Sequence, residues 1–224
     1  MQTSGKIIEL RQFLRERLPE ARLGFAPAPA AAEVWPTGVA GLDRILGGGL
    51  ARGAFSELVG VGDGSGSAQV LHALLRQVAA DGRFLALVDG ADSFDVDAVE
   101  PEVLSHLLLV RCAKADEALK AADLLLRDRN FPLVVLDLKL NAAAELRRIQ
   151  GTTWYRFGRL LEQNGTTVLA ITPYPLVSGV AARVRVEAKL GLADLARRPA
   201  EVVNDLTFAL LRSSAAQERD EAAG

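Results

Sequence analysis

The sequence predicts an α/β domain with a mostly parallel twisted sheet flanked by helices, antiparallel strands near the C-terminus and a helical arm at the N-terminus. First, short apolar segments of strand length alternate with helical patterns of ten or more residues, which implies crossover connections. Second, most of these short segments are apolar throughout, as in parallel sheets covered on both faces. We expect a helix and Ala/Pro linker over 1–33, a core over 34–212 and a disordered tail over 213–224.

The order of the core elements follows from hydrophobic periodicity and from glycines. A helical turn closed by glycines is expected over 38–49, and residues 55–59 alternate in a β-like way. A glycine-rich loop then leads into a helix over 67–80, where apolar residues recur three and four positions apart. The remaining elements expected in this region are buried strands at 84–88, 107–110, 133–136 and 167–171 and helices at 114–127 and 153–163.

The pattern changes toward the C-terminus, where charged and apolar residues alternate. Arg183, Arg185 and Glu187 interleave with Val184 and Val186, which is typical of a strand with one solvated face. Residues 207–212 form a run of suitable length to pair with it. We therefore expect a pair of strands that differs from the parallel core.

Composition excludes some classes of protein. The 224 residues fit one large domain, and the net charge of −2, from 26 basic and 28 acidic residues, argues against a protein that coats nucleic acid. No apolar run approaches the roughly 18 residues that a membrane helix needs. The single cysteine, Cys112, lies in an apolar stretch, so we expect a buried structural thiol rather than a catalytic one. We expect a cytoplasmic protein with no membrane contact.

A strand, a glycine-rich loop and a helix in succession form a geometry that binds phosphate, because loop amides and the helix N-terminus point toward the anion. A working loop of this kind reads G-x-x-x-x-G-K-[ST], and this chain departs from it at each polar position. Ser67 stands where lysine is required, and Ala68 replaces the hydroxyl that would bind Mg²⁺. The expected vestigial phosphate loop consists of Gly60, Gly62, Asp63, Gly64, Gly66 and Ser67.

Two further features weaken this loop as a nucleotide site. The five lysines lie at positions 6, 114, 120, 139 and 189, so no lysine is expected near the loop. Asp63 adds a negative charge where phosphates would lie, at a cost of roughly 1 to a few kcal/mol. We expect a flexible vestige with no bound cofactor; weak nucleotide binding through the amides stays open as an alternative.

The stretch TGVAGLDRILGGGLARGAFSELVG resembles the segment that leads into the phosphate loop of the RecA recombinase family. GRFLALVDGADSFD is similar to the strand that carries the catalytic glutamate of that family, and HLLLVRCAKADEALKAADLLLRDRNFPLVVLDL resembles the next strand, helix and Walker B strand. The resemblance covers about residues 35–212 and implies a RecA-like core.

Transferring the family's functional residues onto this chain implies a degenerate ATPase site. The phosphate-binding lysine falls on Ser67 or Gly66, and the catalytic glutamate falls on Ala91, beside a shifted Asp92. The Walker B aspartate is retained as Asp137, and Thr172–Pro173 replaces the nucleotide-sensing glutamine. The two DNA-binding loops are shortened, to about 140–152 and 173–179. The resemblance thus implies no catalytic residue and no metal.

Among relatives with an eroded ATP site, the chain resembles ImuA, a damage-inducible bacterial protein found with a Y-family polymerase homologue and an error-prone polymerase. This implies a non-catalytic protein of the SOS response that supports translesion synthesis by binding RecA or the polymerase partners. Two alternatives stay open: a divergent DNA-dependent ATPase or recombinase, and a cell-division inhibitor like SulA, which binds FtsZ.

Two segments are candidate binding surfaces. The amphipathic helix at 6–18 is placed like the recombinase arm that packs on a neighbouring subunit, so it is a candidate for partner binding or self-association. Phe25 and Ala28 match the F-x-x-A tether of some recombinases. The candidate partner-binding residues are Ile7, Leu10, Phe13, Leu14, Phe25 and Ala28.

Arginines also gather around two aromatic residues near the expected first DNA-binding loop. Arginines combined with aromatic rings are used both by single-stranded DNA sites and by protein interfaces. The alternative is a solvated helix face with its aromatic residues packed inward. The residues of this arginine–aromatic patch are Arg147, Arg148, Trp154, Arg156 and Arg159, next to Tyr155.

Overall fold

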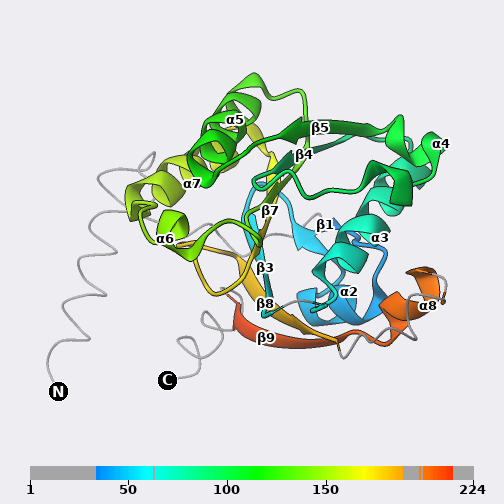
Figure 1. Ribbon diagram of the computed structural model, residues 1–224. Coiled ribbons are helices and arrows are strands. Elements are labelled where there is room, and N and C mark those ends of the chain that lie inside the picture. Colours follow the sequence, from blue (N-terminus) through cyan, green and yellow to red (C-terminus); the bar gives the residue numbers. More distant parts are fainter. Residues whose placement is uncertain (1–33, 63, 189–196, 198, 214–224) are drawn as a thin grey trace, which may run out of the picture. The chain divides into compact units, whose positions relative to one another are not determined.

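A seven-stranded sheet forms the centre of the computed structural model, which describes residues 34–62, 64–188, 197 and 199–213 (Figure 1). The strand order is β5-β4-β6-β7-β3-β8-β9; β9 is antiparallel to β8, and all other neighbours are parallel. The strands are β3 (Phe55–Gly60), β4 (Leu85–Asp89), β5 (Leu107–Arg111), β6 (Leu133–Asp137), β7 (Thr167–Thr172), β8 (Ala182–Glu187) and β9 (Thr207–Ser213). The predicted α/β class and the antiparallel C-terminal pair are confirmed.

Helices cover both faces of the sheet, with α2 and α3 on one side and α5 and α7 on the other (Figure 1). Each face has its own hydrophobic cluster, and the strands contribute apolar side chains to both. The helices are α2 (Ala40–Leu46), α3 (Ser67–Ala80), α4 (Pro101–Leu104), α5 (Ala115–Asp128), α6 (Ala143–Leu146), α7 (Gly151–Asn164) and α8 (Pro199–Asn204). The remaining elements are β1 (Val34–Trp35), β2 (Leu50–Ala51) and the 3₁₀ turn η1 (Val96–Ala98). None of the helices described is both long and apolar enough to cross a membrane.

Helix α3 begins and ends at the predicted residues. Gly66 precedes it with φ of 91°, a conformation that glycine adopts without strain, and the apolar face beyond is fully buried. Helices α5 and α7 begin and end within two residues of their predicted positions. The bounds of helices with a long hydrophobic period can therefore be predicted to within one helical turn.

Three predictions about strands need correction. The sequence predicts alternation in β3, but every residue in it is buried, because it lies between β7 and β8 and is covered on both faces. It predicts burial of β5, but this strand is the edge of the sheet, and Leu108 is 38% exposed. Phe84 precedes β4 instead of starting it; it is 53% exposed and its ring lies 5.3 Å from that of His106.

A buried carboxylate on the inner strand β3 fixes the segment that follows β7. Glu57 has no exposed side-chain surface, and its Oε1 accepts hydrogen bonds from the Thr172 hydroxyl (2.9 Å) and the Leu176 and Val177 amides (2.7 and 3.1 Å). Its Oε2 pairs with Arg183, whose Nη2 also donates to the Val177 carbonyl at 2.5 Å. Both carboxylate oxygens of Glu57 thus have hydrogen-bond partners, which offset the free-energy cost of removing the charge from water.

We predict that Glu57→Gln lowers the free energy of unfolding by about 3 kcal/mol, because Arg183, whose side chain is only 15% exposed, then loses its counter-charge. Urea denaturation at pH 7 measures the change. Glu162→Gln, on the exposed face of α7, is the matched control and should have little effect. Equal stability of the two variants would show that the Glu57 contacts contribute nothing.

Candidate functional site

The predicted phosphate loop connects β3 to α3. Gly62, Gly64 and Gly66 have positive φ of 72°, 65° and 91°, so the loop needs glycine at these positions. Gly60 is also sterically required, because a Cβ there would lie 2.6 Å from the Ser65 hydroxyl. The hydroxyls of Ser65 and Ser67 are on buried residues, while Asp63 lies outside the described residues. The loop is therefore tightly packed at its base.

The prediction that no lysine lies near this loop is wrong. Lys139 Nζ donates a hydrogen bond of 2.8 Å to the Ser65 hydroxyl, across 74 positions of sequence. Strands β3 and β6 run parallel in one sheet, so the segments that follow them meet at the same edge. The ammonium reaches the loop from the end of β6 and bonds to Ser65, whereas Ser67 occupies the position of the expected lysine at the start of α3.

Two aspartates end neighbouring strands beside the loop. Asp89 and Asp137 are register partners on β4 and β6. The Asp89 carboxylate accepts hydrogen bonds from the amides of Ala91 (3.3 Å), Ser93 (2.7 Å) and Phe94 (2.7 Å) and from the Ser93 hydroxyl (3.2 Å). Asp89 therefore holds the turn after β4 and has little capacity left to accept another proton donor.

Asp137, the retained Walker B position, caps the end of β6: its Oδ1 accepts a 3.0 Å hydrogen bond from the Lys139 amide. Burial, with a smaller contribution from the nearby Asp89 carboxylate, raises the pKa of Asp137 to about 6, against the lowering effect of the Lys139 amide.

The position that resemblance assigns to the catalytic glutamate holds no carboxylate. Ala91 occupies it, and the neighbouring Asp92 has φ of 51° and pairs with Arg111 at 2.5 Å. Arg111 also donates to the Phe94 carbonyl at 3.1 Å. Asp92 and Arg111 thus form an ion pair at the surface, and the Asp92 carboxylate is not placed as a general base beside the loop.

A cavity of about 570 Å³ opens beside Ser65 and is bordered by Val61, Val186 and two carboxylates. Those carboxylates are already paired, Glu187 with Arg185 and Asp205 with Arg197, each at 2.6 Å. The charges of both rim carboxylates are therefore balanced by arginines.

The arginine–aromatic patch is only partly as predicted. Trp154 is 2% exposed and packs edge-on against Phe55 and Phe157, with ring centroids 6.1 and 6.3 Å away, so it offers no stacking surface. The helical period explains this, because Trp154, Phe157 and Leu161 share the buried face of α7. Tyr155 instead faces outward and is 68% exposed.

The arginines of the patch all lie at the surface, but their surroundings differ. Arg159 Nη1 donates to the Tyr155 hydroxyl at 3.4 Å, and Arg156 pairs with Asp123 at 3.3 Å. Arg147 and Arg148 are exposed and precede α7. Sequence periodicity could have separated Trp154 from these exposed residues.

Cys112 is buried as predicted, and burial raises the pKa of its thiol. Over the described ranges, no three His, Cys, Asp or Glu side chains come together in a way that could hold a metal ion. The candidate partner-binding residues Ile7, Leu10, Phe13, Leu14, Phe25 and Ala28 lie outside the described residues, as does the tail from residue 214.

No known family model matches the chain. A segment of 111 residues, 48% of this chain, is 33% identical to protein RecA of Leifsonia xyli subsp. xyli (strain CTCB07) and spans 31% of that protein's length. The fold is similar to that of the RadB recombinase, with a TM-score of 0.55 and 20% identity over 68% of this chain and 83% of the other. The predicted RecA-like fold is confirmed, and the similarity to RecA supports a relationship to the RecA-like superfamily.

The raised pKa of Asp137 predicts a pH dependence of stability. The folded protein holds a proton that the unfolded chain releases near pH 3.8, so the stability contribution is complete below pH 3.8 and lost as pH rises through about 6. Asp137→Asn should therefore be more stable than the wild type at pH 8, by about 1 to 2 kcal/mol.

Urea denaturation at pH 4.5 and pH 8 tests this, with Asp97→Asn, an exposed aspartate on η1, as control. The difference in stability between Asp137→Asn and wild type should grow with pH. An equal difference at both pH values would contradict the assigned pKa.

Proposed function

We propose that this protein is a non-catalytic, ImuA-like member of the RecA-like superfamily that acts in the SOS response and supports translesion synthesis by binding RecA, the translesion polymerase partners, or both. The observation that carries the proposal is the state of the phosphate loop. Ser67 replaces its lysine, and Ala91 replaces the catalytic glutamate.

Electrostatics at the site support this proposal over catalysis. Catalysed phosphoryl transfer depends on cations and a base placed around the reacting phosphate. Here Asp89 holds a turn with four hydrogen bonds, and Asp137 caps its own strand. Since these groups are used to hold the fold, the proposal assigns the RecA-like core a scaffolding role.

The described core also offers a place for a partner to dock. Strand β5 is an edge of the sheet, and its backbone groups on the outer side can pair with an added strand. Leu108 on this strand is 38% exposed, which supplies an apolar contact. The proposed docking segments of this chain are residues 6–18, which the sequence predicts to be a helix, and Phe25 with Ala28; they would bind RecA or a second copy of the chain.

The principal test mixes the purified full chain with RecA on single-stranded DNA. We predict co-sedimentation with the filament and a lower rate of RecA ATP hydrolysis, because the bound protein would cap or compete for a subunit interface. Deleting residues 1–30 should weaken both effects by about tenfold or more. Without co-sedimentation at micromolar concentrations the proposed binding to RecA fails, and the polymerase partners and then FtsZ become the proteins to assay.

The presence of Lys139 at the loop favours one competing function, a divergent DNA-dependent ATPase. Under the proposal, the purified protein shows no Mg-ATP turnover with or without single-stranded DNA. Turnover that disappears in Asp137→Asn, and survives in the control Asp97→Asn, would establish the ATPase and overturn the proposal.

A further inference from the structure

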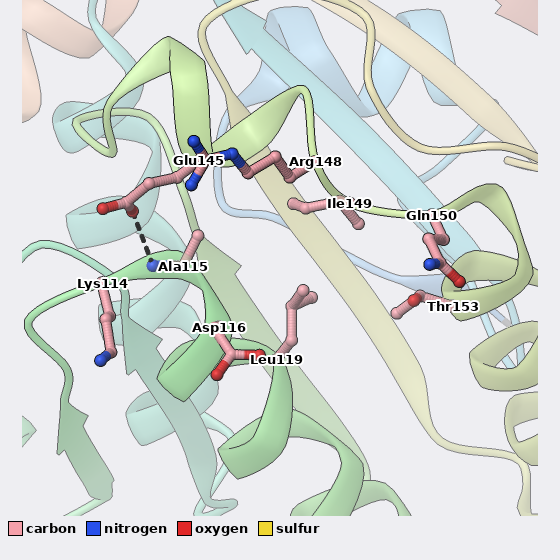
Figure 2. Close-up of a pocket in the computed structure, with 9 residues that line it drawn as sticks. All are labelled: Lys114, Ala115, Asp116, Leu119, Glu145, Arg148, Ile149, Gln150 and Thr153. Atoms are coloured by element: carbon pink, nitrogen blue, oxygen red, sulfur yellow. Dashed lines mark hydrogen bonds between the residues drawn. The ribbon is translucent and has the colours of Figure 1, made fainter.

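Two surface features lie away from the phosphate loop, a cavity and the outer edge of β9. The cavity, of about 490 Å³, is between the start of α5 and the connection from α6 to α7 (Figure 2). Two basic and two acidic side chains line it, so its charge favours no class of ligand; they are Lys114, Arg148, Asp116 and Glu145. The edge of β9, in contrast, has a charge pattern that favours one partner.

Strand β9 is the edge of the sheet opposite β5 (Figure 1), and no other strand in the described part of the chain pairs with its outer side. With seven residues it is the longest strand of this sheet, and it contains neither lysine nor proline, which commonly prevent sheet edges from pairing. Leu210 and Leu211 on it are 44% and 42% exposed. The outer backbone groups of β9 can therefore pair with an added strand, beside apolar side chains.

A β-bulge determines which side chains of β9 share a face. Residues 207–210 pair with β8 one to one, but the pairing then shifts between Arg183 and Val184, which leaves Leu211 as the extra residue. Phe208 and Leu210 consequently lie on the face of the two buried valines of β8. The opposite face, which carries the charged residues of β8, holds Thr207, Ala209 and Arg212.

The two ends of β9 differ in charge. At one end Arg212 lies opposite Arg183, a like charge, and no carboxylate among the described residues pairs with Arg212. At the other end Thr207 lies opposite Glu187. Arg185 Nε approaches the Glu187 carboxylate at 2.6 Å but makes no hydrogen bond, so that carboxylate can still accept donors. A strand that runs antiparallel to β9 and has the same charge pattern would bring a cation to the acidic end.

We infer that β9 pairs in antiparallel register with β9 of a second copy of this chain, about a twofold axis at Ala209. With Leu211 bulged out, Phe208 lies opposite Leu210 of the second copy, and each stays on the face that it occupies in one chain. The buried valine row of β8 then continues across both β9 strands, and the exposed side of Leu210 is covered by a phenylalanine ring.

The same register matches the charges. Arg212 of the second copy lies opposite Thr207 and two strand spacings, roughly 10 Å, from Glu187, which the two extended side chains together span. Thr207 is short and its hydroxyl donates to the Glu187 carbonyl at 3.0 Å, so it leaves that path open. The two Arg185 residues lie three spacings apart, roughly 15 Å, beyond the Debye length of about 8 Å at physiological salt. Parallel pairing would instead place Arg212 beside Arg212.

Sedimentation equilibrium of the full chain tests this pairing. We expect a reversible monomer–dimer equilibrium at micromolar concentrations, and Leu210→Arg should raise the dissociation constant about tenfold or more, because it places a charge against Phe208. Leu124→Arg is the matched control: Leu124 is 69% exposed on α5, away from β9, and its replacement should change the constant less than twofold. Arg212→Ala should raise the constant about fivefold, the effect of one exposed ion pair.

A second measurement does not depend on these variants. Residues at a twofold axis between antiparallel strands have Cα atoms about 4.5 to 5.5 Å apart, within the range that a disulfide bridges. Ala209→Cys should therefore form an intermolecular disulfide under mild oxidation, whereas Leu124→Cys should not; the native Cys112 is buried.

The inference is overturned by a chain that stays monomeric up to about 100 μM, by equal effects of Leu210→Arg and Leu124→Arg, or by a failure of Ala209→Cys to cross-link. A dimer that Leu210→Arg leaves unchanged would use another surface, such as residues 6–18, and would overturn it as well. None of these measurements includes RecA, so their failure is distinct from a failure of the proposed function.

Discussion

The carboxyl ends of parallel strands must meet at one edge of the sheet, and the candidate site depends on this constraint. It brings together the loop after β3, the turn after β4 and the segment after β6, which are far apart in sequence. In a nucleotide-binding protein such an edge gathers cations and a base around phosphate. In this chain, side chains at the same edge form hydrogen bonds within the protein. Lys139 donates to the Ser65 hydroxyl, Asp89 accepts from the turn at 91–94, and Asp137 accepts from the Lys139 amide.

These internal hydrogen bonds hold the geometry of the loop after β3. The glycines at 62, 64 and 66 still have positive φ, and the hydroxyl of Ser65 is still buried. Glu57 on β3 also holds a neighbouring segment in place, because its buried carboxylate accepts hydrogen bonds from the amides of residues 176 and 177.

Local pattern predicts most of the fold because hydrophobic period and glycine position are set by neighbouring residues. Helix α3 and the strand pair β8–β9 are examples. Local sequence pattern does not predict the order of the strands in the sheet. The edge position of β5 and the complete burial of β3 therefore do not follow from it. The candidate site likewise has features that local sequence predicts and features that depend on the sheet. The absence of a lysine after Gly66 is local and can be predicted, whereas the approach of Lys139 depends on how β3 and β6 are placed in the sheet.

We propose that the loop between β3 and α3 does not bind a nucleoside triphosphate tightly. The most direct measurement is the binding of Mg-ATP to the full chain, followed by calorimetry and by the amide NMR signals of Gly62, Gly64 and Ser67. We predict no saturable binding tighter than about 1 mM, because the start of α3 has neither the lysine nor the metal-binding hydroxyl of a working loop. Micromolar binding that shifts these three amides, and that is lost in Lys139→Ala, would show that Lys139 has replaced the missing lysine and would contradict it.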